Sequence, residues 1–360
     1  ADLIPFLGQD EEIVPLAKEY MRIIGFSSLP MLLFLALKHY ADGFEDVLAG
    51  TLVMGGIVIA NIFLNWVLIY GNLGFPELGL NGAGYATTIS RTIGFFLMLG
   101  YILLSKKYQE YRLGSFTFQH QWKTIKKILQ VGVPSGTQYF FEVGSFTGAV
   151  ILIGWIGPDE LAAHQIALGI PAIAYMFYMG LAGAASIRVG HALGRKDLPA
   201  LRMAGMSGIW SGVIFIVISV TAILLLYQWI PGLYIDNPVV EEIAARLLIV
   251  AAFFQLADGV QAIALGALRG MEDVNIPTVL VFIAYWAIGL PVGYVFMESL
   301  GYGVDGMWYG LSIGLMFSAL FLTIRFERRT RHQRASSIFK ITEVSQEPAT
   351  LTKDISASNN

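Results

Sequence analysis

Two carboxyl groups within long apolar segments are the residues of this sequence best placed to do chemistry. Glu142 lies in the middle of the apolar run 128–153, and Asp258 lies in the middle of 240–268. An ionisable group at such a place is costly to bury and usually has a functional role. It can hold a proton, because burial favours the neutral form of an acid, or Na⁺, which prefers oxygen ligands. The competing interpretation is a structural carboxyl with satisfied hydrogen bonds.

Polar side chains flank both acids at helical spacing. Gln138 and Tyr139 precede Glu142 by four and three residues, which places them on the same helix face. The neighbours of Asp258 within about one turn are Phe254, Gln255 and Gln261. The pattern predicts a cation-coupling site for Na⁺ or H⁺ at the two acids. These flanking residues are predicted to line it or to contact a substrate.

Two further polar features lie inside apolar runs. Asn61 and Asn65 stand four residues apart within 50–71 and therefore face one way. They fit a cavity lining and interhelical hydrogen bonding equally well. Arg91 lies inside 82–105, where a structural pairing is the favoured interpretation.

The composition indicates that these residues are held by membrane-spanning helices. The 360 residues are 56% hydrophobic and only 14% charged, with a mean hydropathy of +0.64, whereas soluble domains are about a quarter charged. Runs of about 20 apolar residues predict nine membrane helices. They lie near 15–38, 50–71, 82–105, 128–153, 160–190, 202–227, 240–268, 276–298 and 304–326. We therefore expect an all-α, polytopic membrane helix bundle.

Several function classes are excluded or disfavoured by residues that the sequence lacks. It contains no cysteine, so disulfides, thiolate metal sites and cysteine nucleophiles are excluded. It shows no phosphate-binding loop, no zinc-ligand spacing and no Ser-His-Asp arrangement. We expect no enzyme activity, no cofactor and no nucleic-acid partner, and we expect energy to come from an ion or substrate gradient.

Lysine and arginine predict the orientation of the bundle. Nineteen of the 23 lie in the connections 38–49, 105–127 and 269–275, the connection after 188, and the end of the chain from 325. The alternate connections contain none. This positive-inside pattern predicts a cytoplasmic C-terminal tail. We expect the protein to lie in the cell (inner) membrane.

The chain partly repeats itself. Glu45-Asp46-Val47 recurs as Glu272-Asp273-Val274, so 1–105 resembles 227–326. The segment 128–226 has no such partner, and we expect its partner, about three helices, to precede residue 1. The predicted organisation is an incomplete N-terminal lobe of three helices at 1–105, a cytoplasmic connection at 106–127, a six-helix lobe at 128–326 and a disordered tail at 327–360.

Short motifs add a family resemblance. They are Gly132-Val133-Pro134 before Glu142, Gly157 with Ala162-Ala163-His164-Gln165-Ile166, Ala182, Val189-Gly190 with Gly194, and Leu268-Arg269-Gly270 with Pro277. In this order, together with Asn61 and Asn65, they resemble the multidrug and toxin extrusion family, nearest its NorM branch.

That resemblance implies a monomeric twelve-helix membrane transporter with two lobes and a cleft between them. It implies export of cationic, often aromatic drugs in exchange for Na⁺ or H⁺. In the sodium-coupled branch, acids of the seventh and tenth helices form the cation site, and these match Glu142 and Asp258. The family's first-helix aspartate has no match here.

Three rival functions remain at this point. A lipid-linked oligosaccharide flippase of the same superfamily would need several cationic residues facing the cavity, and Arg91 is the chief one in the sequence. The second rival is a channel or a non-transporting receptor. A receptor would not need two acids in the C-terminal half of a duplicated bundle, and saturable counter-transport, as against ohmic current, would distinguish a transporter from a channel. An intramembrane enzyme would need a catalytic constellation. The sequence does not decide between Na⁺ and H⁺.

Overall fold

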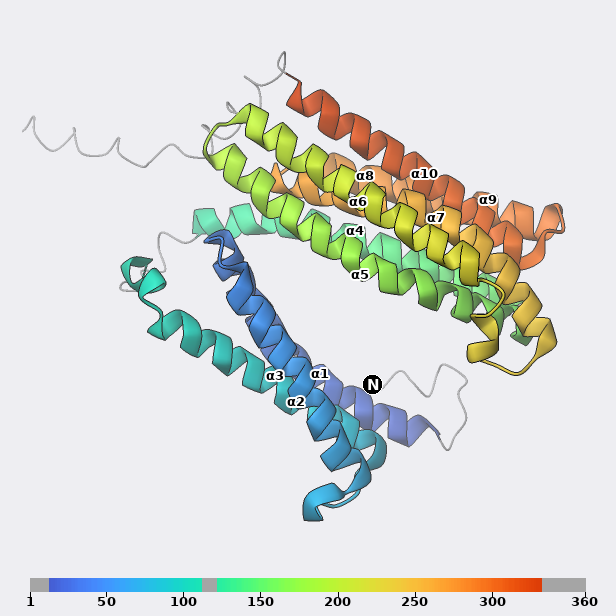
Figure 1. Cartoon of the computed structure of the whole chain (residues 1–360), viewed down its shortest axis with the longest axis horizontal. Helices are drawn as coiled ribbons and strands as arrows, with labels where there is room; N and C mark the ends of the chain where they lie inside the picture. The colour runs from blue at the N-terminus through green and yellow to red at the C-terminus, as the bar shows by residue number, and fades with distance from the viewer. Residues whose placement is uncertain (1–12, 112–121, 332–360) are drawn as a thin grey trace, which may run out of the picture. The chain divides into compact units, whose positions relative to one another are not determined.

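The computed structural model describes residues 13–111 and 122–331, and within them the chain is helical with no strand (Figure 1). The chain divides into two compact units, Ala1–Thr117 and Phe118–Asn360. We call them the first and second unit and describe each by itself.

The first unit is built around three long helices, whose bounds are α1 (Ile13–Gly43), α2 (Val47–Tyr70) and α3 (Gly79–Leu104). Short helical turns follow α2 and α3, namely η2 (Asn72–Gly74) and η3 (Lys106–Tyr111). Helix α3 packs against both α1 and α2. Small residues allow this, since a Cβ on Gly82 would collide with the backbone of Leu68, and one on Gly94 would collide with the side chain of Ile57.

The second unit contains five long, regular helices. They are α4 (Trp122–Gly154), α5 (Pro158–Gly194), α6 (Leu198–Leu226), α7 (Pro238–Gly270) and α10 (Gly303–Thr330), with the turn η5 (Pro231–Leu233) before α7. Helix α7 is the most buried of them and packs against α5, α6 and α10 (Figure 1). Its central place explains why an acid on α7 is cut off from solvent.

A sixth crossing of the second unit changes helix type along its length. Its segments are α8 (Asn275–Phe282), the π-helical η6 (Ile283–Gly289), α9 (Leu290–Tyr294) and the π-helical η7 (Val295–Ser299). Turns of π-helix inside α-helices often accompany functional sites. Here η6 carries Tyr285, which lies near the candidate site described below.

Glycines let α10 approach this irregular helix closely. Gly306, Gly310 and Gly314 recur every four residues and so share one face of α10. A Cβ added to Gly310 would collide with the backbone of Gly293, and one added to Gly314 would collide with that of Ala284 and Gly289. This is the small-residue packing that membrane helices use in place of a hydrophobic driving force.

The apolar runs predicted the helices well. Among the described residues, eight helices are long and apolar enough to cross a membrane, so the prediction of an all-α, multi-pass bundle is confirmed. The ninth predicted span, 128–153, corresponds to α4, which is long enough but is not one of the eight. Polar residues such as Gln138 and Glu142 lower its mean hydropathy.

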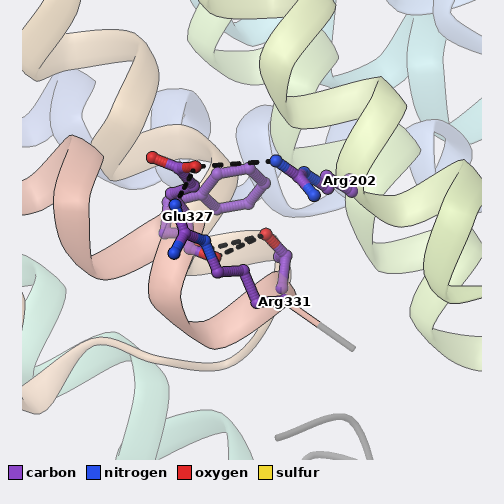
Figure 2. A network of polar contacts seen from close by, with 5 residues as sticks. Arg202, Glu327 and Arg331 are labelled. Carbon is purple, nitrogen blue, oxygen red and sulfur yellow. Dashed lines mark hydrogen bonds and ion pairs between the residues drawn. The ribbon is translucent and has the colours of Figure 1, made fainter. Parts of the chain in front are cut away.

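The end of α10 differs slightly from expectation. The tail was predicted from 327, but α10 continues to Thr330, while 332–360 lie outside the described residues. Figure 2 shows how this end is held: Glu327 accepts a hydrogen bond from Arg331 at 2.9 Å and forms an ion pair with Arg202 of α6 at 3.6 Å. The last turn of α10 is therefore anchored to the start of α6.

The repeated sequence forms a repeated turn. Glu45 and Glu272 both adopt a left-handed backbone, with φ of 59° and 58°. In each turn the following aspartate, Asp46 or Asp273, donates its backbone N–H to the carbonyl five residues earlier. This is the Schellman pattern that ends a helix. Lys196, with φ of 56°, begins a third such turn before Asp197.

Candidate functional site

Glu142 lies inside the second unit, between α4, α5 and α7. Its side chain is 7% exposed, and its Oε1 accepts a hydrogen bond from the hydroxyl of Tyr175 on α5 at 3.3 Å. Near Glu142, two hydrogen bonds join α4 to the irregular crossing that runs from α8 to η7. Thr278 donates to the carbonyl of Pro134 at 3.0 Å, and the indole of Trp286 donates to that of Phe141 at 2.9 Å.

A small pocket opens at Glu142 where one face of each of three helices converges. Residues 138, 139 and 142 come from α4, residues 175, 179 and 182 come from α5, and residues 261, 262, 265 and 269 come from α7. The spacings of three, four and seven or eight residues are those of single helix faces. The pocket volume is about 10 Å³, at the lower limit for a single water molecule. It suits a small ion and excludes an aromatic drug.

Asp258 lies one turn before the pocket residues of α7. Its side chain is buried, at 5% exposure, and its charge is within electrostatic range of Glu142. Among residues 13–111 and 122–331, none donates a hydrogen bond to its carboxyl in this structure. Two buried carboxylates in mutual range repel each other, so the pair favours a bound positive charge.

The two glutamines beside Asp258 are each half satisfied. Oε1 of Gln255 accepts from Tyr178 at 3.1 Å and from Ser219 at 2.9 Å. The amide of Gln261 donates to the hydroxyl of Tyr285 at 3.1 Å. Nε2 of Gln255 and Oε1 of Gln261 are buried and find no partner within the described part of the chain. An unpaired buried amide oxygen beside a carboxylate is a suitable ligand for a cation or for a water bound to it.

The pocket also contains a positive charge. Arg269, in the last turn of α7, lies over the ring of Tyr139, with 5.5 Å between the guanidinium carbon and the ring centroid. Its charge is within electrostatic range of Glu142. The described residues contain no group of three or more His, Cys, Asp or Glu that could hold a metal ion.

The structure brings most of the predicted residues together. Gln138, Tyr139 and Gln261 line the pocket with Glu142, and Gln255 adjoins Asp258 on α7. Phe254 is also on α7, but it packs in the core against Phe146 and Trp308, at centroid distances of 6.1 and 5.5 Å. It is not one of the residues that line the pocket.

Six residues that line the pocket were not among the predicted site residues, namely Tyr175, Met179, Ala182, Ala262, Leu265 and Arg269. Tyr175 and Met179 lie among many aromatic and apolar residues of α5, where no spacing distinguishes them. Arg269 belonged to a recognised motif, but its place at the end of a predicted span indicated a membrane flank. Its distance of eleven residues from Asp258, about three helical turns, was the signal that could have placed both on one face.

Asn61 and Asn65 lie in the first unit. Asn65 donates to Oδ1 of Asn61 at 3.1 Å, and Asn61 donates to hydroxyls of α3, namely Thr87 at 3.3 Å and Ser90 at 3.2 Å. These are the interhelical hydrogen bonds that one interpretation expected. Oδ1 of Asn65 is buried without a partner in the described residues, and a cavity-lining role for the pair stays a prediction.

Within the described residues Arg91 makes a structural contact, but with a hydroxyl and not with an acid. Its guanidinium donates to the hydroxyl of Ser27 on α1 at 2.6 Å. Arg91 thus has a structural contact within the first unit.

A multi-pass helical bundle with repeated helix-ending turns and buried carboxyls inside its spans has the features of a membrane transporter. The chain belongs to the MatE family, whose model matches residues 1–67 and 134–295. It is therefore a transporter and not an enzyme, as the sequence predicted.

Relatives with curated names are similar over most of the chain. A protein of Rhizobium meliloti, described as "Probable multidrug resistance protein NorM", is 37% identical over 341 residues, which cover 93% of this chain and 73% of the relative. "Multidrug resistance protein NorM" of Photobacterium profundum is 34% identical over 330 residues, or 90% of this chain and 72% of the relative. The predicted family and branch are confirmed.

Solved structures share the fold. A crystal structure titled as MATE in the straight conformation superposes with a TM-score of 0.83 at 22% identity, covering 94% of this chain and 74% of that one. The crystal structure of the eukaryotic MATE transporter AtDTX14 superposes with a TM-score of 0.82 at 19% identity. The match covers 94% of this chain and 75% of that one. At these identities the likeness concerns the fold alone.

Proposed function

We propose that this protein is a secondary active multidrug exporter that moves organic cations out of the cell in exchange for Na⁺ or H⁺. The observation that carries the proposal is the pair Glu142 and Asp258, both buried within helices of one unit and within electrostatic range of each other. The curated names of the relatives supply the substrate class, since they describe multidrug resistance proteins.

The pocket supports a small coupling ion at Glu142. Its volume of about 10 Å³ is too small for an organic cation. Oxygen atoms of Glu142, Tyr175 and Gln261 border it or lie beside it, and these are ligands that Na⁺ accepts. A proton on either carboxyl would remove the repulsion equally well. The drug would occupy space that opens in another conformation.

Coupling would follow from differential affinity. A ligand shifts a two-state equilibrium only as far as its affinities for the two states differ. The external ion would bind the carboxyl pair, favour one access state and thereby promote release of the drug outside. The distribution of Lys and Arg supports a cytoplasmic C-terminal tail, and we infer an inner-membrane location for an exporter of this kind.

The test is efflux of a fluorescent organic cation such as ethidium from proteoliposomes that contain the full-length native protein. A Na⁺ gradient and a pH gradient are applied separately, and the gradient that drives efflux identifies the ion. A double variant Glu142→Gln and Asp258→Asn should lose gradient-driven efflux. Glu298→Gln, at an exposed carboxyl in η7, is the matched control and should keep it.

Two results would contradict the proposal. Normal gradient-driven efflux by the double variant would remove the carboxyl pair from the mechanism. An ohmic current without saturable counter-transport would indicate a channel instead.

A further inference from the structure

Arg269 shares its helix face with the residues that line the pocket. Gln261, Leu265 and Arg269 follow one another at intervals of four residues on α7, and all three line the pocket of Glu142. Asp258 lies three residues before Gln261. Along α7 the charges are therefore ordered, with Asp258 toward the middle of the helix and Arg269 at its end, about 16 Å away along the axis.

One contact places the guanidinium of Arg269 on an aromatic face, in the pocket that Glu142 also lines. Tyr139 supplies the ring, and its hydroxyl is directed to the sulfur of Met179 on α5 at 3.9 Å. Tyr139 is three residues before Glu142 on α4, so ring and carboxylate are on one face. The free energy of a cation–π contact is about that of a weak ion pair, so the contact holds the guanidinium without fixing it rigidly.

Arg269 is thus a covalently attached cation at a site whose carboxylate would bind a mobile one. A bound Na⁺ and the guanidinium repel each other and use the same negative charge. The negative end of the α7 dipole also favours a positive charge at the helix terminus, where Arg269 lies.

We propose that Arg269 acts as a tethered competitor of the coupling ion for the Glu142 carboxylate. From its place over Tyr139 it offsets part of the negative charge of Glu142, and its own charge repels an ion that enters the pocket. It weakens ion binding, and it thereby keeps the site able to release its ion in each transport cycle. The inference rests on the proposed function, since it concerns the regulation of that same ion site.

The absence of cysteine from the sequence makes a direct experiment possible. Arg269→Cys is introduced into the full-length protein, with any other cysteine replaced. One sample is treated with methyl methanethiosulfonate, which leaves the side chain neutral, and another with aminoethyl methanethiosulfonate, which restores a positive charge. Both samples derive from one folded preparation, so a folding defect affects them alike. Binding of ²²Na⁺ is measured on each in the absence of a gradient.

The neutral sample should bind Na⁺ about tenfold more tightly than the positively charged one. Arg269→Lys should stay within about twofold of the unaltered protein, because it keeps the charge. Arg246→Cys is the matched control: it lies on the same helix, pairs with Asp305 at 3.2 Å, and should show no difference between the reagents.

The outcomes separate this inference from the proposed function. Equal Na⁺ affinity of the neutral and charged samples would overturn the competitor role, even where Glu142→Gln abolishes Na⁺ binding and so supports the proposed ion site. Unchanged Na⁺ binding by Glu142→Gln would instead overturn the ion site itself. An unaltered protein that binds no Na⁺, but exports drug in response to a pH gradient, would overturn the competitor role for Na⁺ and leave the exporter standing.

Discussion

The turns at Asp46 and Asp273 have the same backbone but hold their carboxylates in different ways. Asp46, in the first unit, accepts hydrogen bonds from Tyr108 at 2.7 Å and Tyr101 at 2.9 Å, and Lys107 is 3.9 Å away. Asp273, in the second unit, receives no hydrogen bond from a tyrosine hydroxyl of the described residues.

The partners of Asp273 are two arginines of α10. Arg325 binds it with two hydrogen bonds, at 2.8 and 2.9 Å, and Arg329 approaches to 3.3 Å. Both turns end a helix by the same geometry and place an acid before the next helix. The comparison teaches that the duplicated element is the backbone turn, and that each unit stabilises the acid with whatever side chains its own helices supply.

The largest expected effect comes from removing the charge of Asp273. Asp273→Asn leaves two arginines without their counter-charge in a largely buried place, and should lower the free energy of unfolding by about 3 kcal/mol. Urea unfolding in detergent measures the change. Arg329→Gln is the control, because it keeps the two-bond contact of Arg325, and should cost less than half as much. Equal losses would show that the two-bond contact is not the main stabilising one.

A smaller effect is expected at the matching acid of the first unit. Tyr108→Phe removes one hydrogen bond to Asp46 but leaves Tyr101 and Lys107, and should cost about 1 kcal/mol. The same unfolding assay applies. A loss as large as that of Asp273→Asn would mean that hydroxyls and arginines hold the two turns equally firmly, which would abolish the contrast.

The pH dependence of this contact has a definite sign. Burial alone would raise the pKa of Asp46, but the hydrogen bonds from Tyr108 and Tyr101 and the charge of Lys107 outweigh it and leave the pKa below its ordinary value. A lowered folded-state pKa gives stability that is present above the unfolded value of about 3.9 and is lost as the pH falls through the folded value.

Unfolding measured between about pH 6 and pH 3 should therefore show a stability loss in the acid range that Tyr108→Phe diminishes. Tyr40→Phe, next to the same ring but without a hydrogen bond to Asp46, is the control. If the free energy of unfolding fell more steeply with acid in the Tyr108→Phe variant than in the unaltered protein, this explanation would be contradicted.

The smallest effect concerns the left-handed residue of the turn. Glycine adopts this backbone freely, whereas other residues are strained there by about 1 kcal/mol. Glu272 also pairs with Lys127 at 2.9 Å, an exposed contact worth about 0.5 kcal/mol. Glu272→Gly should therefore raise stability by about 0.5 kcal/mol, and Lys127→Gln, which removes only the ion pair, should lower it slightly. Destabilisation by Glu272→Gly would show that the pair outweighs the strain.

The sequence predicted the helices and the acids because those signals are local. Apolar runs located each crossing, and charge in the middle of a run identified Glu142 and Asp258. The repeat at 45–47 and 272–274 predicted a shared structure, and the turns have it. The neighbours that a helix face contacts come from distant parts of the chain, and helical spacing does not reveal them. For this reason the spacing grouped Phe254 with Asp258, although the ring of Phe254 packs in the core. The same reason hid Tyr175, which reaches Glu142 from a different helix.

The glycine face of α10 has a mechanical consequence. Because Gly310 and Gly314 bring backbone against backbone at Gly289 and Gly293, sliding by even one residue would drive side chains into the opposing helix. We therefore expect α10 and the crossing α8–η7 to move together. Helix α4, which carries Glu142, meets α8 and η6 through side chains instead, namely hydrogen bonds from Thr278 and Trp286 and the ring pair Phe141–Phe282, whose centroids are 4.8 Å apart. We therefore expect a rearrangement that admits a substrate to this unit to shift α4 before it shifts α10.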